Sequence, residues 1–148
     1  IRHLLKNTLH MRPDRIIVGE VRSNEVLDML QAMTTGHEGS MTTLHSNSAT
    51  EALDRLEMLT LMDSPNISVV VARRQIVSAI DVVIYMNRFA DGTRKVVQVA
   101  ELIKDEKTEF KLEDIFHLPK GEGEGLVFSG KKPAFYDKLK RTGFKCTV

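Results

Sequence analysis

The chain has 148 residues, 42% of them hydrophobic and 28% charged, which is typical of one compact globular domain and excludes a disordered or fibrous segment. Its 21 basic and 20 acidic side chains leave a formal net charge of +1, so charge gives no reason to expect a nucleic-acid partner. The lone Cys146 excludes an internal disulfide and favours a reducing cytoplasm. No apolar run approaches the roughly 20 residues that span a bilayer, so membrane association has to come through a partner or through other sequence.

The first half of the chain predicts helices that alternate with short strands. Apolar residues at Ile1, Leu4, Leu5 and Leu9 have helical spacing from the first residue, which suggests the interior of a longer polypeptide. The β-branched run 15–18 predicts a strand buried on both faces, as in a parallel sheet. Residues 41–44 predict a second strand.

Two further helices follow these strands in the predicted order. Ser23 or Asn24 is expected to cap a helix that ends at Gly36, because these residue types favour helix termini. Ser48 and Glu51 form the pattern of a capping box. The order strand, helix, strand, helix predicts an α/β fold.

The second half changes character after residue 80. Residues 68–80 predict a helix, whereas 82–86 and 95–99 predict two strands of an antiparallel hairpin. Residues 109–112 are a candidate third strand. Residues 120–125 alternate glycine with charge and predict a loop, and a final helix is expected from Pro133 to Gly143.

Polar side chains follow both predicted strands directly. Glu20 and then Arg22 come after the first strand, and His45 comes after the second. Ligands of an open parallel sheet bind at the carboxyl ends of its strands, where a carboxylate can hold a magnesium-bound water and an imidazole can donate to a phosphate oxygen. Taken singly, such a glutamate is more often a solvated turn residue, and such a histidine a capping or packing residue.

The stretch around His37 and Glu38 begins like a zinc-protease helix. The residue four positions after His37 is Met41, not a second histidine. The glycines at 36 and 39 also oppose a helix. The sequence therefore argues against zinc.

Two segments taken together resemble a known family. Residues 11–22, MRPDRIIVGEVR, resemble the Walker B segment of the type II/type IV secretion ATPases, and residues 36–49, GHEGSMTTLHSNSA, resemble their His box. Both occur in the family's order and separation. The first segment is most similar to that of the Tad/Flp pilus assembly ATPases of the CpaF kind.

The resemblance implies a fold and a division of the chain. The fold would be a partial RecA-like P-loop NTPase core of parallel strands and helices, extended by an antiparallel hairpin and a C-terminal helix. Residues 1–118 would be the C-terminal part of that domain, and 119–148 a glycine-rich loop with a basic tail.

The resemblance also implies roles for particular residues. Glu20 would be the Walker B acid, which serves Mg²⁺ through water, and His45 would face the terminal phosphate of ATP. Arg22, His37 and Gly39 would belong to the nucleotide-binding surroundings.

The P-loop pattern Gly-x-x-x-x-Gly-Lys-Ser/Thr occurs nowhere in the sequence, so this chain would carry half a nucleotide site and be inactive alone. The parent protein would be a homohexameric ATPase at the cytoplasmic face of the inner membrane, acting on a platform protein in pilus assembly or secretion. A type IV secretion or conjugation ATPase is one alternative. A binding module that keeps the scaffold without a P-loop is the other.

Overall fold

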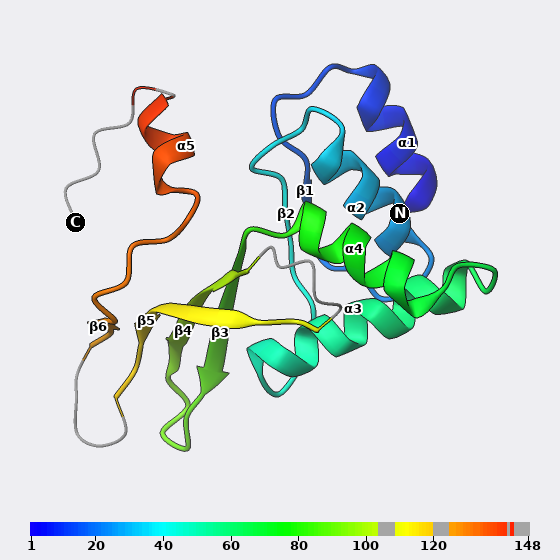
Figure 1. Cartoon of the computed structure of the whole chain (residues 1–148). Helices are drawn as coiled ribbons and strands as arrows, with labels where there is room; N and C mark the ends of the chain where they lie inside the picture. Colours follow the sequence, from blue (N-terminus) through cyan, green and yellow to red (C-terminus); the bar gives the residue numbers. More distant parts are fainter. Residues whose placement is uncertain (104–108, 120–124, 142, 144–148) are drawn as a thin grey trace. The chain divides into compact units, whose positions relative to one another are not determined.

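The computed structural model describes residues 1–103, 109–119, 125–141 and 143 (Figure 1). It divides into two compact units, Ile1–Ile80 with Ile103–Lys111, and Asp81–Leu102 with Leu112–Val148. The functional division after residue 118 rests on the resemblance alone and stays a prediction.

The first unit has the predicted alternation of helices and strands. Its elements are α1 (Arg2–His10), β1 (Ile17–Val18), α2 (Glu25–Thr34), β2 (Met41–Thr42), α3 (Ala49–Asp63) and α4 (Val69–Ala79). Both strands are shorter than predicted. The α/β fold class is confirmed, and the helix predicted for residues 68–80 is α4, which Ser68 caps through the backbone N–H of Val71 at 3.4 Å.

β1 and β2 pair in parallel, with Ile17 opposite Met41 and Val18 opposite Thr42. Successive residues of a strand point to opposite faces of the sheet. Ile16 is 4% exposed and belongs to the core, whereas Ile17 is 70% exposed. The prediction that this strand is buried on both faces is therefore wrong for the described residues, because only the face of Ile16 meets the core.

The core of the first unit lies around α2. Its largest fully buried apolar side chains come from the loop after β1 and from three helices: Val21, Val26, Met29, Leu53 and Ile76. Burying each of these apolar side chains stabilises the fold by about 1.5–3 kcal/mol.

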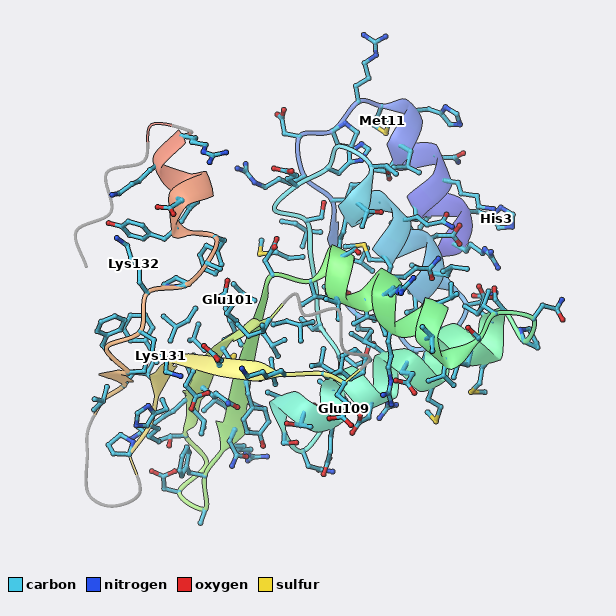
Figure 2. The ribbon with its side chains drawn as sticks, viewed as in Figure 1. His3, Met11, Glu101, Glu109, Lys131 and Lys132 are labelled. Atoms are coloured by element: carbon cyan, nitrogen blue, oxygen red, sulfur yellow. The ribbon has the colours of Figure 1, made fainter. Side chains whose placement is uncertain are left out.

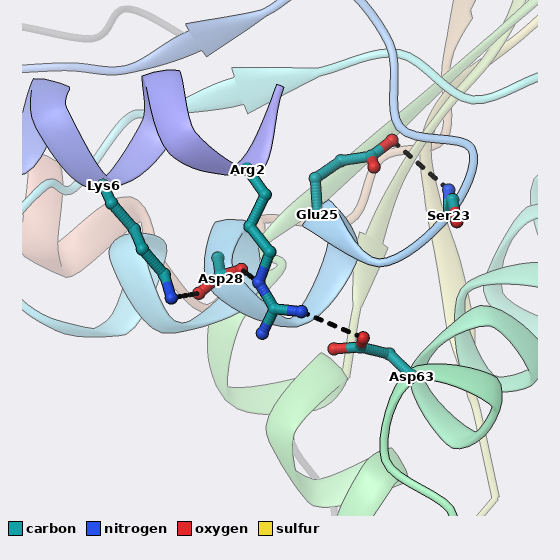
Figure 3. Close-up of polar contacts among 6 residues, drawn as sticks. All are labelled: Arg2, Lys6, Ser23, Glu25, Asp28 and Asp63. Carbon is teal, nitrogen blue, oxygen red and sulfur yellow. Dashed lines mark hydrogen bonds and ion pairs between the residues drawn. The ribbon is translucent and has the colours of Figure 1, made fainter.

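An ion-pair network joins three helices of the first unit (Figure 3). Arg2 of α1 reaches Asp28 of α2 at 2.6 Å and Asp63 at the end of α3 at 3.2 Å. Lys6 lies 3.9 Å from the same Asp28 carboxylate. Because both carboxylates are nearly buried, this network fixes how α1 lies on α2 and α3.

The second unit is built on an antiparallel sheet in the order β3-β4-β5-β6. Its elements are β3 (Val82–Arg88), β4 (Arg94–Leu102), β5 (Leu112–His117), β6 (Val127–Phe128) and α5 (Tyr136–Arg141). The predicted hairpin is confirmed as β3 and β4. The third strand begins only at Leu112, since the preceding residues 109–111 belong to the first unit, where the Arg73 guanidinium lies 5.5 Å from the centre of the Phe110 ring.

A buried carboxylate anchors the segment that enters α5. Glu101 of β4 is 8% exposed and accepts hydrogen bonds from the backbone N–H groups of Ala134 at 2.9 Å and Phe135 at 3.3 Å. Figure 2 labels Glu101 and the two lysines, Lys131 and Lys132, that precede this segment. The final helix is shorter than predicted, and most of the predicted glycine-rich loop, residues 120–124, lies outside the described residues. None of the described helices is long and apolar enough to cross a membrane.

Candidate functional site

Thr43 holds the segments beyond β1 and β2 side by side. Its carbonyl oxygen accepts a hydrogen bond from the backbone N–H of Val21 at 3.1 Å, and its hydroxyl donates to the carbonyl of Gly19 at 2.5 Å. Glu20 lies between these two anchored residues, and His45 follows Thr43 by two positions. The pairing of the strands therefore continues far enough to bring Glu20 and His45 together at the carboxyl end of the sheet.

The Glu20 carboxylate lies between two basic side chains. Arg22 forms an ion pair with Oε1, and His45 Nε2 lies 3.4 Å from Oε2. Oε2 is buried and has no hydrogen-bond partner within the described part of the chain. The hydrogen bond from Arg22, helped by the charges of Arg22 and His45, outweighs partial desolvation and lowers the pKa of Glu20. Glu20 is therefore an ionised carboxylate at neutral pH, with Oε1 paired to Arg22 and Oε2 beside His45.

The loop that carries His45 is fixed to the start of α3. Arg55 donates to the carbonyl oxygen of His45 at 3.1 Å. Ser48 caps α3 by accepting from the Glu51 backbone N–H at 3.1 Å, while the Glu51 carboxylate accepts from the backbone N–H of Asn47 at 3.2 Å. The predicted cap is confirmed for Ser48. The Glu51 side chain, however, accepts from the backbone N–H of Asn47, one residue before the N–H of Ser48 that a capping box uses. The backbone of His45 is thus held while its side chain remains 83% exposed.

A buried carboxylate also fixes the backbone at Arg22. Glu25 is 5% exposed, and its Oε1 accepts from the backbone N–H of Arg22 at 2.6 Å. The same oxygen accepts from the backbone N–H of Ser23 at 3.3 Å, the contact drawn in Figure 3. Asn24 is the residue that precedes α2, but its side chain makes no cap hydrogen bond. The prediction of a Ser23 or Asn24 side-chain cap is wrong because Asn24 already has helical φ and ψ, whereas a capping side chain needs an extended backbone.

We expect Glu25→Gln to destabilise the chain in a pH-dependent way. Burial raises the pKa of Glu25, but hydrogen bonds from backbone N–H groups, that of Arg22 first, bring it below the ordinary 4.5. A lowered folded-state pKa gives stability that is present above 4.5 and is lost as pH falls through the folded pKa. Urea unfolding at about pH 7 should show that the free energy of unfolding of Glu25→Gln is about 1–2 kcal/mol below that of wild type.

The difference in the free energy of unfolding between wild type and Glu25→Gln should stay constant above pH 4.5 and become smaller below it. Glu109→Gln, at an exposed position of the same unit, is the matched control and should change little. A difference that does not vary with pH would show that Glu25 acts through its shape and not through its charge.

His37 and Gly39 lie at the opposite ends of the strands. Ser40 Oγ donates to the carbonyl of His37 at 2.7 Å and accepts from the backbone N–H of Ile16 at 2.9 Å, just before β1 and β2 begin. Gly39 has φ +80°, and a Cβ there would approach Arg15 Nε to 2.8 Å. The structure brings Arg22 to Glu20 and His45, but not His37 or Gly39, whose nucleotide-binding role stays a prediction.

Sequence reasoning missed three residues that position this site, namely Thr43, Glu25 and Arg55. The sequence predicted Thr43 only as a strand residue. A threonine can also donate a hydrogen bond from its hydroxyl while its backbone bonds to the neighbouring strand. Arg55 lies on α3, ten residues after His45, and nothing in the sequence pattern indicated its contact with the His45 carbonyl. Glu25 carried a weak signal, because an acidic residue suits the first turn of a helix.

The donor set at the site fits a magnesium ion better than a metal that needs many protein ligands. The described residues contain no group of three or more His, Cys, Asp or Glu side chains able to hold a metal. Mg²⁺ keeps several waters and binds through one or two carboxylates together with phosphates. Glu20 supplies one such carboxylate.

Comparisons with known proteins agree on one family. A family model described as type II/IV secretion system protein matches residues 1–114. The conjugal transfer protein TrbB of Rhizobium radiobacter is 47% identical over 91 residues, which are 62% of this chain and 27% of that protein. The type IV secretion system protein VirB11 of Brucella suis is 31% identical over 108 residues, 71% of this chain and 29% of that protein.

A solved structure shares the fold. The crystal structure of the VirB11 ATPase from the Brucella suis type IV secretion system, in complex with sulphate, superposes with a TM-score of 0.63 and 30% identity, covering 68% of this chain and 31% of that one. The chain thus spans roughly a third or less of the length of these relatives. The narrower resemblance to the Tad/Flp pilus ATPases stays a prediction. The chain belongs to the type II/IV secretion system ATPase family.

Proposed function

We propose that this chain supplies the Walker B and His-box half of an ATP-hydrolysing site, within a longer protein that also carries a P-loop. The observation that supports the proposal is the arrangement at the strand ends, where Oε2 of the ionised Glu20 lies 3.4 Å from His45 Nε2. A fixed carboxylate beside an exposed imidazole suits phosphate chemistry, which depends on positioning and charge.

Each residue would perform a distinct task in that site. Bound Mg²⁺ would neutralise charge on the phosphates. Glu20 would hold a metal-bound water and orient the attacking water through Oε2. His45, with its backbone held by Arg55 and its ring in solvent, would donate to the terminal phosphate and respond to its loss. His37 and Gly39 would shape the turn that leads into β2.

At the level of the machine, we propose a homohexameric ATPase at the cytoplasmic face of the inner membrane that acts on a platform protein. The names of the relatives, conjugal transfer protein and type IV secretion system protein, favour type IV secretion or conjugation over pilus assembly as the system served. ATP and Mg²⁺ are the expected ligands, and nucleic acid is not an expected partner of this chain.

The 148-residue chain alone is expected to bind ATP weakly and to hydrolyse none. The backbone N–H groups and the lysine that hold the phosphates belong to the P-loop, whose pattern the sequence lacks. The test compares phosphate release and the binding of a fluorescent ATP analogue for this chain and for the complete gene product. Turnover by the chain alone would contradict a divided site. A complete product without a P-loop would instead support the binding-module alternative.

A further inference from the structure

Both the backbone N–H and the guanidinium of Arg22 have partners, while most of its side chain is exposed to solvent. Its backbone N–H donates to the buried Glu25 at 2.6 Å, and its guanidinium pairs with Glu20 Oε1. The side chain between these points is 69% exposed. The residue therefore has a fixed backbone and a long side chain whose guanidinium pairs with one carboxylate oxygen of Glu20.

A pair of this kind is easily exchanged. Solvent-exposed ion pairs contribute little, because water screens the charges and a long side chain loses rotamer freedom when it is held. A divalent cation carries twice the charge of a guanidinium and repels it at the same carboxylate. Arg22 and a metal ion therefore compete for Glu20.

We infer that Arg22 is a displaceable counter-ion of Glu20. Its guanidinium neutralises the carboxylate before the metal binds and then moves away, while the hydrogen bond to Glu25 keeps the Arg22 backbone in place. This inference rests on the proposed function of Glu20. The freed guanidinium presents a planar fork of N–H donors that matches phosphate. Metal binding at Glu20 would thereby move the Arg22 guanidinium from the carboxylate toward the phosphates of the nucleotide.

Arg22 differs from Arg2 and Arg73, which also form ion pairs in the first unit. Arg73 pairs with Glu57 at 2.5 Å and also lies over the Phe110 ring, and its side chain is 29% exposed. Arg2 spans two nearly buried carboxylates. Both arginines join helices to one another, whereas the Arg22 pair links positions only two residues apart in one loop.

The first test uses the 148-residue chain and Mn²⁺ as the paramagnetic probe. Signal broadening around Glu20 in NMR spectra reports metal at the carboxylate. In Arg22→Gln, half-maximal broadening should need about two- to fivefold less Mn²⁺ than in wild type, since the competing cation is gone. Arg74→Gln, which removes an exposed cation on α4, should match wild type.

The second test follows Arg22 itself. Adding Mg²⁺ should move the Arg22 Nε–H signal of the wild-type chain toward the position of a free arginine, while the signal of Arg73 stays in place. An unmoved Arg22 signal, or equal Mn²⁺ requirements in wild type and Arg22→Gln, would overturn the inference.

A third variant keeps this inference distinct from the proposed function. Glu20→Gln should abolish the local broadening by Mn²⁺. If broadening persists in Glu20→Gln, the metal binds elsewhere and the proposed role of Glu20 fails. If it disappears while Arg22→Gln behaves as wild type, only the counter-ion role fails.

Discussion

Replacing Glu20 by glutamine in the complete protein is expected to lower ATP turnover by about a hundredfold or more, while nucleotide binding and folding change little. The amide keeps the size of the side chain but loses the charge that positions a metal-bound water and the attacking water. Removal of a positioned acid or base typically costs a factor of about 10²–10⁴. The measurements are steady-state phosphate release, nucleotide affinity and thermal unfolding of the same preparation.

The best control for Glu20→Gln is Glu109→Gln. Glu109, labelled in Figure 2, is an exposed glutamate of the same unit, so its replacement removes the same charge away from the strand ends. Turnover should then equal that of wild type. If Glu20→Gln also retains wild-type turnover, Glu20 is a solvated turn residue and the proposed site must be abandoned.

The sequence predicted the part of the fold that local rules determine. The capping pattern at Ser48 predicted the start of α3, and the runs 82–86 and 95–99 predicted the β3–β4 hairpin. It failed where tertiary contacts decide the outcome. Residues 109–112 were predicted as a strand. The strand starts only at Leu112, because Phe110 packs beside Arg73 within the first unit.

The same distinction applies to the candidate site. The prediction that Glu20 and His45 meet followed from parallel strands with polar residues at their carboxyl ends, and the structure brings them together. The sequence pattern did not predict the contact that keeps them together, because Thr43 donates to the carbonyl of Gly19, which lies 24 positions away in the sequence. The structure does not bring His37 to His45, because the turn that contains His37 precedes β2 and lies at the other end of that strand. The nucleotide-binding role of His37 stays a prediction.

His45→Ala in the complete protein is expected to reduce ATP turnover roughly tenfold to a hundredfold, with a parallel fall in secretion or pilus output. A hydrogen bond to a charged group contributes about 1.5–3 kcal/mol, which corresponds to that range of rates. The free energy of unfolding should change by less than about 0.5 kcal/mol, since the side chain is 83% exposed. Turnover per folded molecule and urea unfolding, measured on one preparation, separate the two effects.

The matched control for His45→Ala is His3→Ala, because His3 is also an exposed histidine of the first unit and lies on α1 (Figure 2). Loss of a solvated imidazole at that position should leave turnover unchanged. The loop backbone should survive the change at His45, because Arg55 binds its carbonyl oxygen and not its ring. A variant that unfolds at much lower denaturant yet turns over normally per folded molecule would make His45 a packing residue. In that case neither a phosphate contact nor the His-box role could be kept for it.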